Sequence, residues 1–204
     1  MKARGMFLLA LCLSALAAAI GTETGPDPYE EDCMHFPEQK IKDMVSINGP
    51  LYVKLRNYDT RTQYRCHSME NIQKISENVY RYRLRALYPR NRTFTEHYIN
   101  STLWESGSHE EPNAANYTEN NNNVTVKLMT KNDNNTCFVL VRYTTDNEKH
   151  CDLLMTRETV DSHIPESCGG VYLQHCTNYK EFSVELWKKN CISDINIYEQ
   201  LPAC

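Results

Sequence analysis

The sequence predicts an all-β fold, an antiparallel sheet with one short helix before it and one helix after it. Apolar and polar residues alternate along several short segments, which is the period of a strand with one buried face. Turn-rich connections separate these segments, as in consecutive antiparallel strands. Periodicity does not distinguish a closed barrel from a sandwich of two sheets, so both architectures stay open at this point.

The clearest predicted strand is residues 79–88. Its inner face is expected to carry Tyr80, Tyr82 and Leu84, and its outer, wet face Arg81, Arg83 and Arg85. Another strand, residues 51–56, begins directly after the Asn48-Gly49-Pro50 turn and places Leu51, Val53 and Leu55 on one face. Further strands are expected at residues 65–75, 94–104, 124–130, 137–143 and 151–157.

Two helices are expected at the borders of the sheet. Residues 36–45 place Ile41, Met44 and Val45 on one side, which predicts a short amphipathic helix. Residues 166–175 form the second predicted helix, entered through Pro165. The tail, residues 182–204, is expected to be extended and anchored by two cysteines.

The N-terminus is typical of a secretory signal peptide. Lys2 and Arg4 precede an apolar run over residues 6–19, which ends on small residues. We expect a signal peptide over residues 1–20, cleaved after Ala19 or Gly21, then an acidic leader over 21–35 and one domain over 36–204. No second apolar run is long enough for a transmembrane helix, so the expected destination is extracellular.

Charge and motifs exclude several function classes. Without Lys2 and Arg4, the chain has 20 basic and 26 acidic side chains, a net charge of −6, which argues against nucleic acid or anionic membrane as a partner. The sequence contains no Gly-x-Ser-x-Gly, no His-Glu-x-x-His and no phosphate-binding glycine loop. We therefore expect a monomeric binding protein without a cofactor, and not an enzyme.

The cysteines indicate a disulfide framework. Eight remain after Cys12 leaves with the signal peptide, and an even number in an oxidising compartment predicts four disulfides. They are Cys33, Cys66, Cys137, Cys151, Cys168, Cys176, Cys191 and Cys204. A metal site that uses His150 beside Cys151, or His175 beside Cys176, is the alternative, but the spacings match no metal-binding pair, so no metal is expected.

Five Asn-x-Ser/Thr sites indicate N-glycosylation, with at least two of them occupied. The acceptor residues are Asn91, Asn100, Asn116, Asn123 and Asn134. Because glycans need solvent, we expect this part of the chain to run through exposed loops and outward strand faces.

Three groups of residues resemble the tick salivary lipocalins, the family that contains the histamine-binding proteins. Residues 51–59 followed by Cys66 are similar to the family's first strand and downstream cysteine. Cys137 opens one strand, and Cys151-Asp-Leu-Leu lies in the next. Ile164-Pro-Glu-Ser-Cys168, with Tyr172 beyond, is similar to the segment that leads into the family's C-terminal helix. The resemblance implies an eight-stranded antiparallel barrel with a ligand cavity.

The same resemblance implies a set of ligand contacts and two departures from the family pattern. Phe138 stands where amine-binding members carry Asp, and Asp152-Leu153-Leu154 stands for Glu-Leu-Trp. Both departures weaken the inference to histamine, since an ammonium needs carboxylate partners. The implied ligand-binding residues are Asp43, Tyr58, Tyr80, Tyr82, Glu96 and Asp152, with Asp152 the most informative of them.

The family also implies disulfide partners. The pairs carried over are Cys66 with Cys191 and Cys137 with Cys168, which leaves Cys33 with Cys176 and Cys151 with Cys204.

The expected function is that of a scavenger that holds a small host mediator, a biogenic amine or a lipid, and so blunts host defence. The alternative is a glycosylated immunomodulator that binds a host protein through its outer surface. An open cavity lined by tyrosines and a buried carboxylate would favour the scavenger, and a filled interior would favour the alternative.

Overall fold

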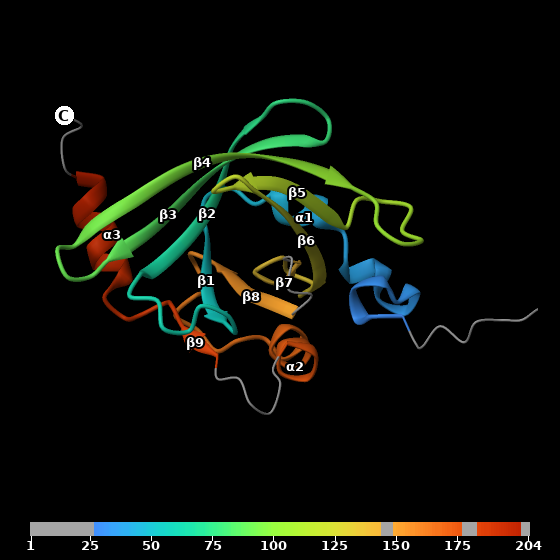
Figure 1. Ribbon diagram of the computed structural model, residues 1–204. Helices are drawn as coiled ribbons and strands as arrows, with labels where there is room; N and C mark the ends of the chain where they lie inside the picture. The colour runs from blue at the N-terminus through green and yellow to red at the C-terminus, as the bar shows by residue number, and fades with distance from the viewer. Residues whose placement is uncertain (1–26, 144–148, 177–182, 201–204) are drawn as a thin grey trace, which may run out of the picture.

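A closed antiparallel barrel forms the body of the protein (Figure 1). The structure, a computed structural model, describes residues 27–143, 149–176 and 183–200. Its strands are β1 (Leu51–Arg56), β2 (Arg65–Lys74), β3 (Val79–Tyr88), β4 (Thr93–Trp104), β5 (Ala114–Glu119), β6 (Asn122–Lys131), β7 (Cys137–Tyr143), β8 (Lys149–Thr156) and β9 (Val184–Glu185). From β1 to β8 each strand pairs with the next, and β1 also pairs with β8, which closes the barrel. The predicted all-β fold and the eight-stranded barrel that the resemblance implies are both confirmed. The sandwich that periodicity left open is excluded.

The short strand β9 completes the wall where β1 and β2 diverge. β1 pairs with β2 only at Leu51 and Tyr52, and its other end pairs with β9. The Leu186 amide donates to the carbonyl of Lys54 at 3.1 Å, and the Cys66 amide donates to the carbonyl of Leu186 at 2.9 Å. These backbone groups of the two diverging strands therefore have hydrogen-bond partners. Without β9 they would lie unpaired at a strand edge.

Strand β5 of the barrel was not predicted from the sequence. Its inward residues Ala115 and Tyr117 alternate with Asn116 and Thr118, so the apolar signal is weak. The hairpin to β6 turns at residues 120–121, two asparagines with φ of 50° and 65°. Positive φ at both central residues is the requirement of the tight hairpin turn that suits twisted strands, and asparagine adopts it readily.

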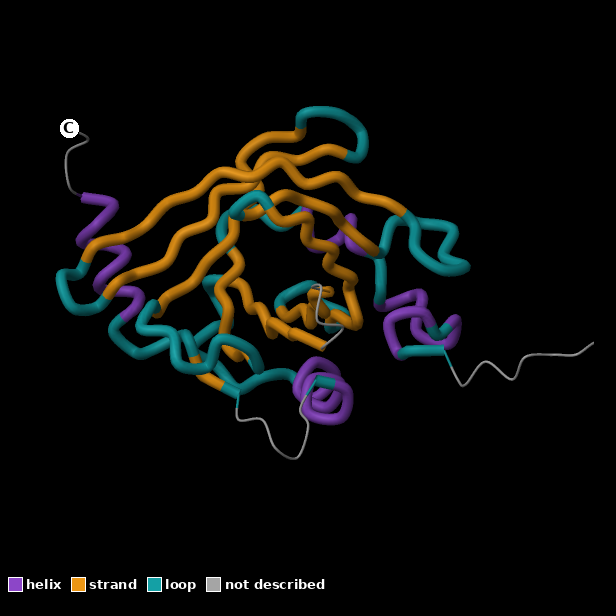
Figure 2. The backbone as a smooth tube through the Cα atoms, viewed as in Figure 1, coloured by secondary structure: helices purple, strands orange, loops and turns teal. Residues whose placement is uncertain are grey.

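Helical segments surround the barrel (Figure 2). They are η1 (Tyr29–Glu31), η2 (Cys33–Glu38), α1 (Ile41–Val45), α2 (Glu166–His175) and α3 (Cys191–Gln200). The helix predicted over residues 36–45 is divided, because the chain leaves η2 at Gln39 and the Ile41 amide donates to the carbonyl of Pro112 at 3.0 Å. The helix predicted over residues 166–175 is confirmed as α2, which packs outside β6, β7 and β8.

The expectation of an extended tail is wrong, because Cys191–Gln200 forms α3. Cys191 and Ile195 lie one helical turn apart, and both are buried. They pack in one cluster with Leu87 and Phe94. This packing against the end of the β3–β4 hairpin favours the helix over an extended chain.

α3 also changes the outer face of β3. Tyr82 and Leu84 face the cavity as expected, and Arg81 is exposed. Arg85, expected to face water, is only 7% exposed and forms an ion pair with Glu199 of α3 at 3.4 Å. That expectation is wrong, because a helix that strand periodicity cannot foresee covers this part of the sheet.

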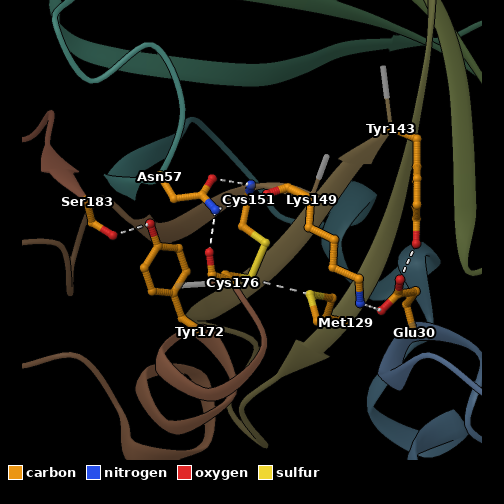
Figure 3. Close-up of a disulfide and its surroundings, with 9 residues drawn as sticks. All are labelled: Glu30, Asn57, Met129, Tyr143, Lys149, Cys151, Tyr172, Cys176 and Ser183. Carbon is orange, nitrogen blue, oxygen red and sulfur yellow. Dashed lines mark hydrogen bonds and ion pairs between the residues drawn. A yellow bond between two sulfur atoms is a disulfide. The ribbon is translucent and has the colours of Figure 1, made fainter. Parts of the chain in front are cut away.

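The folded region includes residues assigned to the acidic leader. Glu30 is fully buried, accepts a hydrogen bond from the Tyr143 hydroxyl and pairs with the Lys149 ammonium at 3.1 Å (Figure 3). A buried carboxylate needs such partners to offset its lost hydration. The segment expected as a leader is therefore, from Tyr29 on, part of the domain.

Among the described residues, three disulfides tie the helices to the barrel. Cys66–Cys191 and Cys137–Cys168 match the pairs that the resemblance implies. The third bond joins Cys151 to Cys176 (Figure 3), so the expected pairs Cys33 with Cys176 and Cys151 with Cys204 are wrong. Cys33 is exposed and forms no disulfide with another described residue, and Cys204 lies outside the described part of the chain.

The Cys151–Cys176 disulfide is explained by the hydrogen bonds of Asn57, which follows β1 directly. The Asn57 side chain accepts from the Cys151 amide at 2.7 Å and donates to the carbonyl of Cys176. It thereby places the two cysteines side by side (Figure 3). Their bond to each other also removes the metal site considered for these cysteines and their neighbouring histidines.

The expected signal peptide, residues 1–20, lies outside the described residues. Within the described ranges, no helix combines the length and the apolar character needed to cross a membrane.

Candidate ligand-binding cavity

The barrel contains a cavity of about 570 Å³. Inward residues of β1 to β8, together with α1, form its wall. The apolar part of the wall consists of Ile41, Met44, Val45, Val53, Met69, Leu84, Ile99, Leu103, Ala115, Val126, Leu140 and Leu154. This volume falls within the usual range for a site that encloses one small organic molecule.

One end of the cavity is apolar because α1 packs there. Ile41, Met44 and Val45 belong to one buried cluster with Tyr82 and with inward residues of β1, β4 and β8. The Val45 carbonyl accepts a hydrogen bond from Asn71 of β2 at 2.9 Å, which holds α1 against the wall. Phe138, which stands where amine-binding relatives carry Asp, is fully buried in the same cluster.

The opposite end is polar, and its centre is Asp152. Arg56 donates to both carboxylate oxygens of Asp152, from Nε at 2.6 Å and from Nη2 at 3.0 Å. The Tyr58 hydroxyl donates to Oδ2 at 2.8 Å. The Arg56 guanidinium also lies 4.3 Å from the centre of the Tyr58 ring. A bidentate pair with a third donor is the geometry that neutralises a carboxylate most completely.

A bulge in β1 brings Arg56 into the cavity. Strict alternation would place Arg56 on the face opposite Val53, but the register with β8 shifts between Val53 and Leu55. Val53 pairs with Leu154 and Arg56 with Asp152, so both face inward, and Leu55 pairs with Leu153 on the outer side. One extra residue reverses the faces of the strand beyond it.

A second ion pair lies beside the first. Arg142 of β7 donates to Glu119 of β5 at 2.7 Å and to the Tyr117 hydroxyl at 3.4 Å. Its guanidinium lies 5.9 Å from the centre of the Tyr58 ring. Two guanidinium groups and two carboxylates therefore neutralise one another in this part of the wall.

Protonation in the polar end follows from burial and from these pairs. Burial by itself would lower the pKa of Arg56, but the Asp152 carboxylate raises it above its ordinary value. Burial and the same carboxylate raise the pKa of Tyr58 well above that of a free phenol. Burial also raises the pKa of Tyr117 to about 12. Near neutral pH the two phenols are therefore protonated and uncharged.

His67 of β2 lies between the apolar and polar parts of the wall. Burial, with Arg56 nearby, lowers the pKa of His67 to about 4, so the imidazole is neutral near neutral pH. Its Nε2 is buried, and within the described ranges it has no hydrogen-bond partner. His67, Arg56 and Arg142 could not be recognised as site residues from the sequence, because a single histidine or an alternating arginine carries no site motif.

The structure brings three of the six sequence-predicted ligand residues to the cavity, namely Tyr58, Tyr82 and Asp152. The other three do not line it. Asp43 pairs with Lys131 at 3.1 Å. The Tyr80 hydroxyl donates to the carbonyl of Glu77 at 3.3 Å, and Glu96 accepts from the exposed Tyr98 hydroxyl.

A closed antiparallel barrel with a flanking helix and an internal, mainly apolar cavity defines a ligand-binding barrel of the lipocalin class. The sequence profile described as tick histamine binding protein matches residues 29–193, and the chain belongs to this family.

Solved structures of tick lipocalins share the fold. AM182 in complex with serotonin aligns with a TM-score of 0.53 at 13% identity, over 82% of this chain and 94% of that one. Japanin from Rhipicephalus appendiculatus bound to cholesterol aligns with a TM-score of 0.54 at 15% identity, over 72% of this chain and 99% of that one. No curated protein sequence matches this chain significantly.

Proposed function

We propose that this protein is a secreted lipocalin that sequesters a small, mainly apolar host mediator and so blunts host defence. The observation that carries the proposal is the cavity of about 570 Å³ with an apolar end under α1 and a polar end at Asp152. Such a site binds by excluding water from an apolar body and orienting it with a few polar groups. Stoichiometric binding is sufficient, and no chemical step is involved.

The geometry supports a lipid over a biogenic amine. An ammonium needs a carboxylate that is free to pair with it, whereas Asp152 already holds Arg56 and Tyr58. Phe138 supplies no substitute. The proteins of similar fold do not decide between an amine and a lipid, since AM182 was solved with serotonin and japanin with cholesterol.

The open cavity also favours the scavenger over a decoy that binds a host protein by its outer surface. A decoy needs no internal space, and its interior is expected to fill with side chains, as in ordinary protein cores. Here Tyr58, Tyr82 and a mostly buried carboxylate line an open cavity.

The test is native mass spectrometry of protein from a eukaryotic host, followed by calorimetric titration with histamine, serotonin and the uncharged lipid dodecanol. We expect a co-purified lipid, or binding of dodecanol at one site. The variant Val126→Phe places a ring in the cavity and should weaken this binding by at least about tenfold. Arg81→Gln, on the exposed face of β3, is the control and should bind as wild type does. Tight amine binding would contradict the lipid assignment, and absence of all binding would contradict the scavenger.

A further inference from the structure

We propose that His67 makes the cavity selective for uncharged ligands that carry a hydroxyl or carbonyl group, by a hydrogen bond between that group and Nε2. The inference rests on the proposed function, because it assigns the ligand class and the polar contact of the same cavity.

The first observation is the unsatisfied nitrogen. His67 lies in the cavity wall, and its Nε2 is buried without a hydrogen-bond partner in the part of the chain that the structure describes. A buried polar atom in this condition is costly, and a ligand atom that pairs with it recovers that cost. The other buried side-chain atoms in the same condition include Tyr52 Oη and Trp104 Nε1, which belong to residues outside this wall.

The second observation is the position of His67 along the strand. β1 and β2 pair at Leu51 with Met69 and run antiparallel, so from Met69 to His67 the inner face of β2 moves toward the Arg56 end of β1. A ligand with its apolar body against α1 and Met69 would present its polar group beside His67. The contact therefore fits an amphipathic molecule in one orientation.

The third observation concerns charge. The two guanidinium groups that point into the cavity already have carboxylate partners: Arg56 pairs with Asp152 and Arg142 with Glu119. Asp59, the remaining acidic residue of the wall, is exposed to solvent. An ionised head group would have to break one of these pairs or remain unpaired in the cavity, and both are unfavourable.

The neutral state of His67 is consistent with these three observations. With its pKa lowered by burial to about 4, its imidazole carries no charge near neutral pH and attracts neither a carboxylate nor an ammonium. Nε2 of a neutral imidazole pairs with a hydroxyl in either tautomer, as acceptor or as donor, and with a carbonyl when it carries the proton.

The experiment compares ligands with one tail and different head groups. Dodecanol, dodecanoate and dodecylammonium compete with the uncharged fluorophore N-phenylnaphthylamine for the wild-type cavity near neutral pH. We expect dodecanol to bind most tightly. His67→Phe should weaken dodecanol binding about tenfold, equivalent to about 1.4 kcal/mol, and should leave fluorophore binding in place.

Two further variants separate hydrogen bonding from cavity shape. His67→Gln retains a polar group near the position of Nε2 and should restore most of the preference for the alcohol. Ile72→Val, at an exposed position of the same strand, is the control and should change nothing. Fluorophore binding without a preference for dodecanol, or a preference that survives in His67→Phe, overturns the inference but leaves the proposed function standing. If neither the fluorophore nor any dodecyl compound binds, the proposed function fails and the inference fails with it.

Discussion

Asp152 lies in the cavity wall, yet its partner there is not the one expected. The family resemblance implied a ligand contact at Asp152, and strand alternation by itself left its side open. The partner, however, is Arg56 of the same wall and not a ligand ammonium. The first consequence of changing Asp152 should therefore appear in stability.

Asp152→Asn should lower the free energy of unfolding by about 3 to 5 kcal/mol, the usual range when one member of a buried pair is removed. The side chains of Arg56 and Asp152 are 13% and 17% exposed, so the remaining guanidinium would be mostly desolvated. Chemical denaturation with the disulfides intact measures the change. The double variant Arg56→Met, Asp152→Leu removes both charges and should recover most of the loss; equal losses in the two variants would contradict the pairing argument.

His67 should make stability depend on pH. Its pKa is about 6.5 in the unfolded chain and about 4 in the folded protein, so on acidification the unfolded state binds the proton first. Stability is therefore retained above pH 6.5 and lost as the pH falls toward 4, by up to about 3 kcal/mol. The measurement is the difference in unfolding free energy between wild type and His67→Gln across this range. A difference that does not change with pH would show that His67 is not held neutral.

At the scale of elements, the bulge in β1 and the disulfides decide how the wall is built. The bulge turns Arg56 inward, and the Cys66–Cys191 bond fixes α3 beside the β2 end of the barrel. The Cys151–Cys176 bond joins β8 to the end of α2. The Cys66–Cys191 and Cys151–Cys176 bonds close loops of different length, so their contributions to stability can be ranked.

Removal of Cys66–Cys191 by paired alanine substitutions should destabilise the protein more than removal of Cys151–Cys176. The sequence separations are 125 and 25, and loop-closure entropy gives a difference of about 1.4 kcal/mol between the two variants. Equilibrium unfolding of both variants provides the comparison. Peptide mapping of the wild type under non-reducing conditions is the companion measurement, and a Cys151 peptide linked to Cys204 would overturn the pairing described above.

At the scale of the whole molecule, three of the five N-glycosylation sites lie on one side of the barrel. All five acceptor asparagines are exposed, as expected. On β4, β5 and β6 the inward residues include Ser101, Ala115, Tyr117 and Val126, so Asn100, Asn116 and Asn123 lie on the outer face of three adjacent strands. Glycans there would cover this wall and leave the cavity untouched.

We therefore expect occupied glycans within the group Asn100, Asn116 and Asn123, and unchanged ligand affinity after their removal. Glycopeptide mass spectrometry of protein from a eukaryotic host gives the occupancy. The triple variant with glutamine at these positions, compared with the wild type in the dodecanol titration, tests the second part. Loss of affinity in a correctly folded triple variant would place the glycans in the binding function.

The sequence by itself determined the all-β class, most of the strands, helix α2 and, through family resemblance, the barrel and two disulfides. These depend on local periodicity and on residue types, which every segment carries within itself. Tertiary structure alone decided what depends on neighbours distant in sequence. The β1 bulge placed Arg56 opposite Asp152, α3 buried Arg85, and Asn57 brought Cys151 to Cys176. The ligand site depends on such long-range contacts, because the charge available to a ligand is what remains after side chains of the wall have paired with one another.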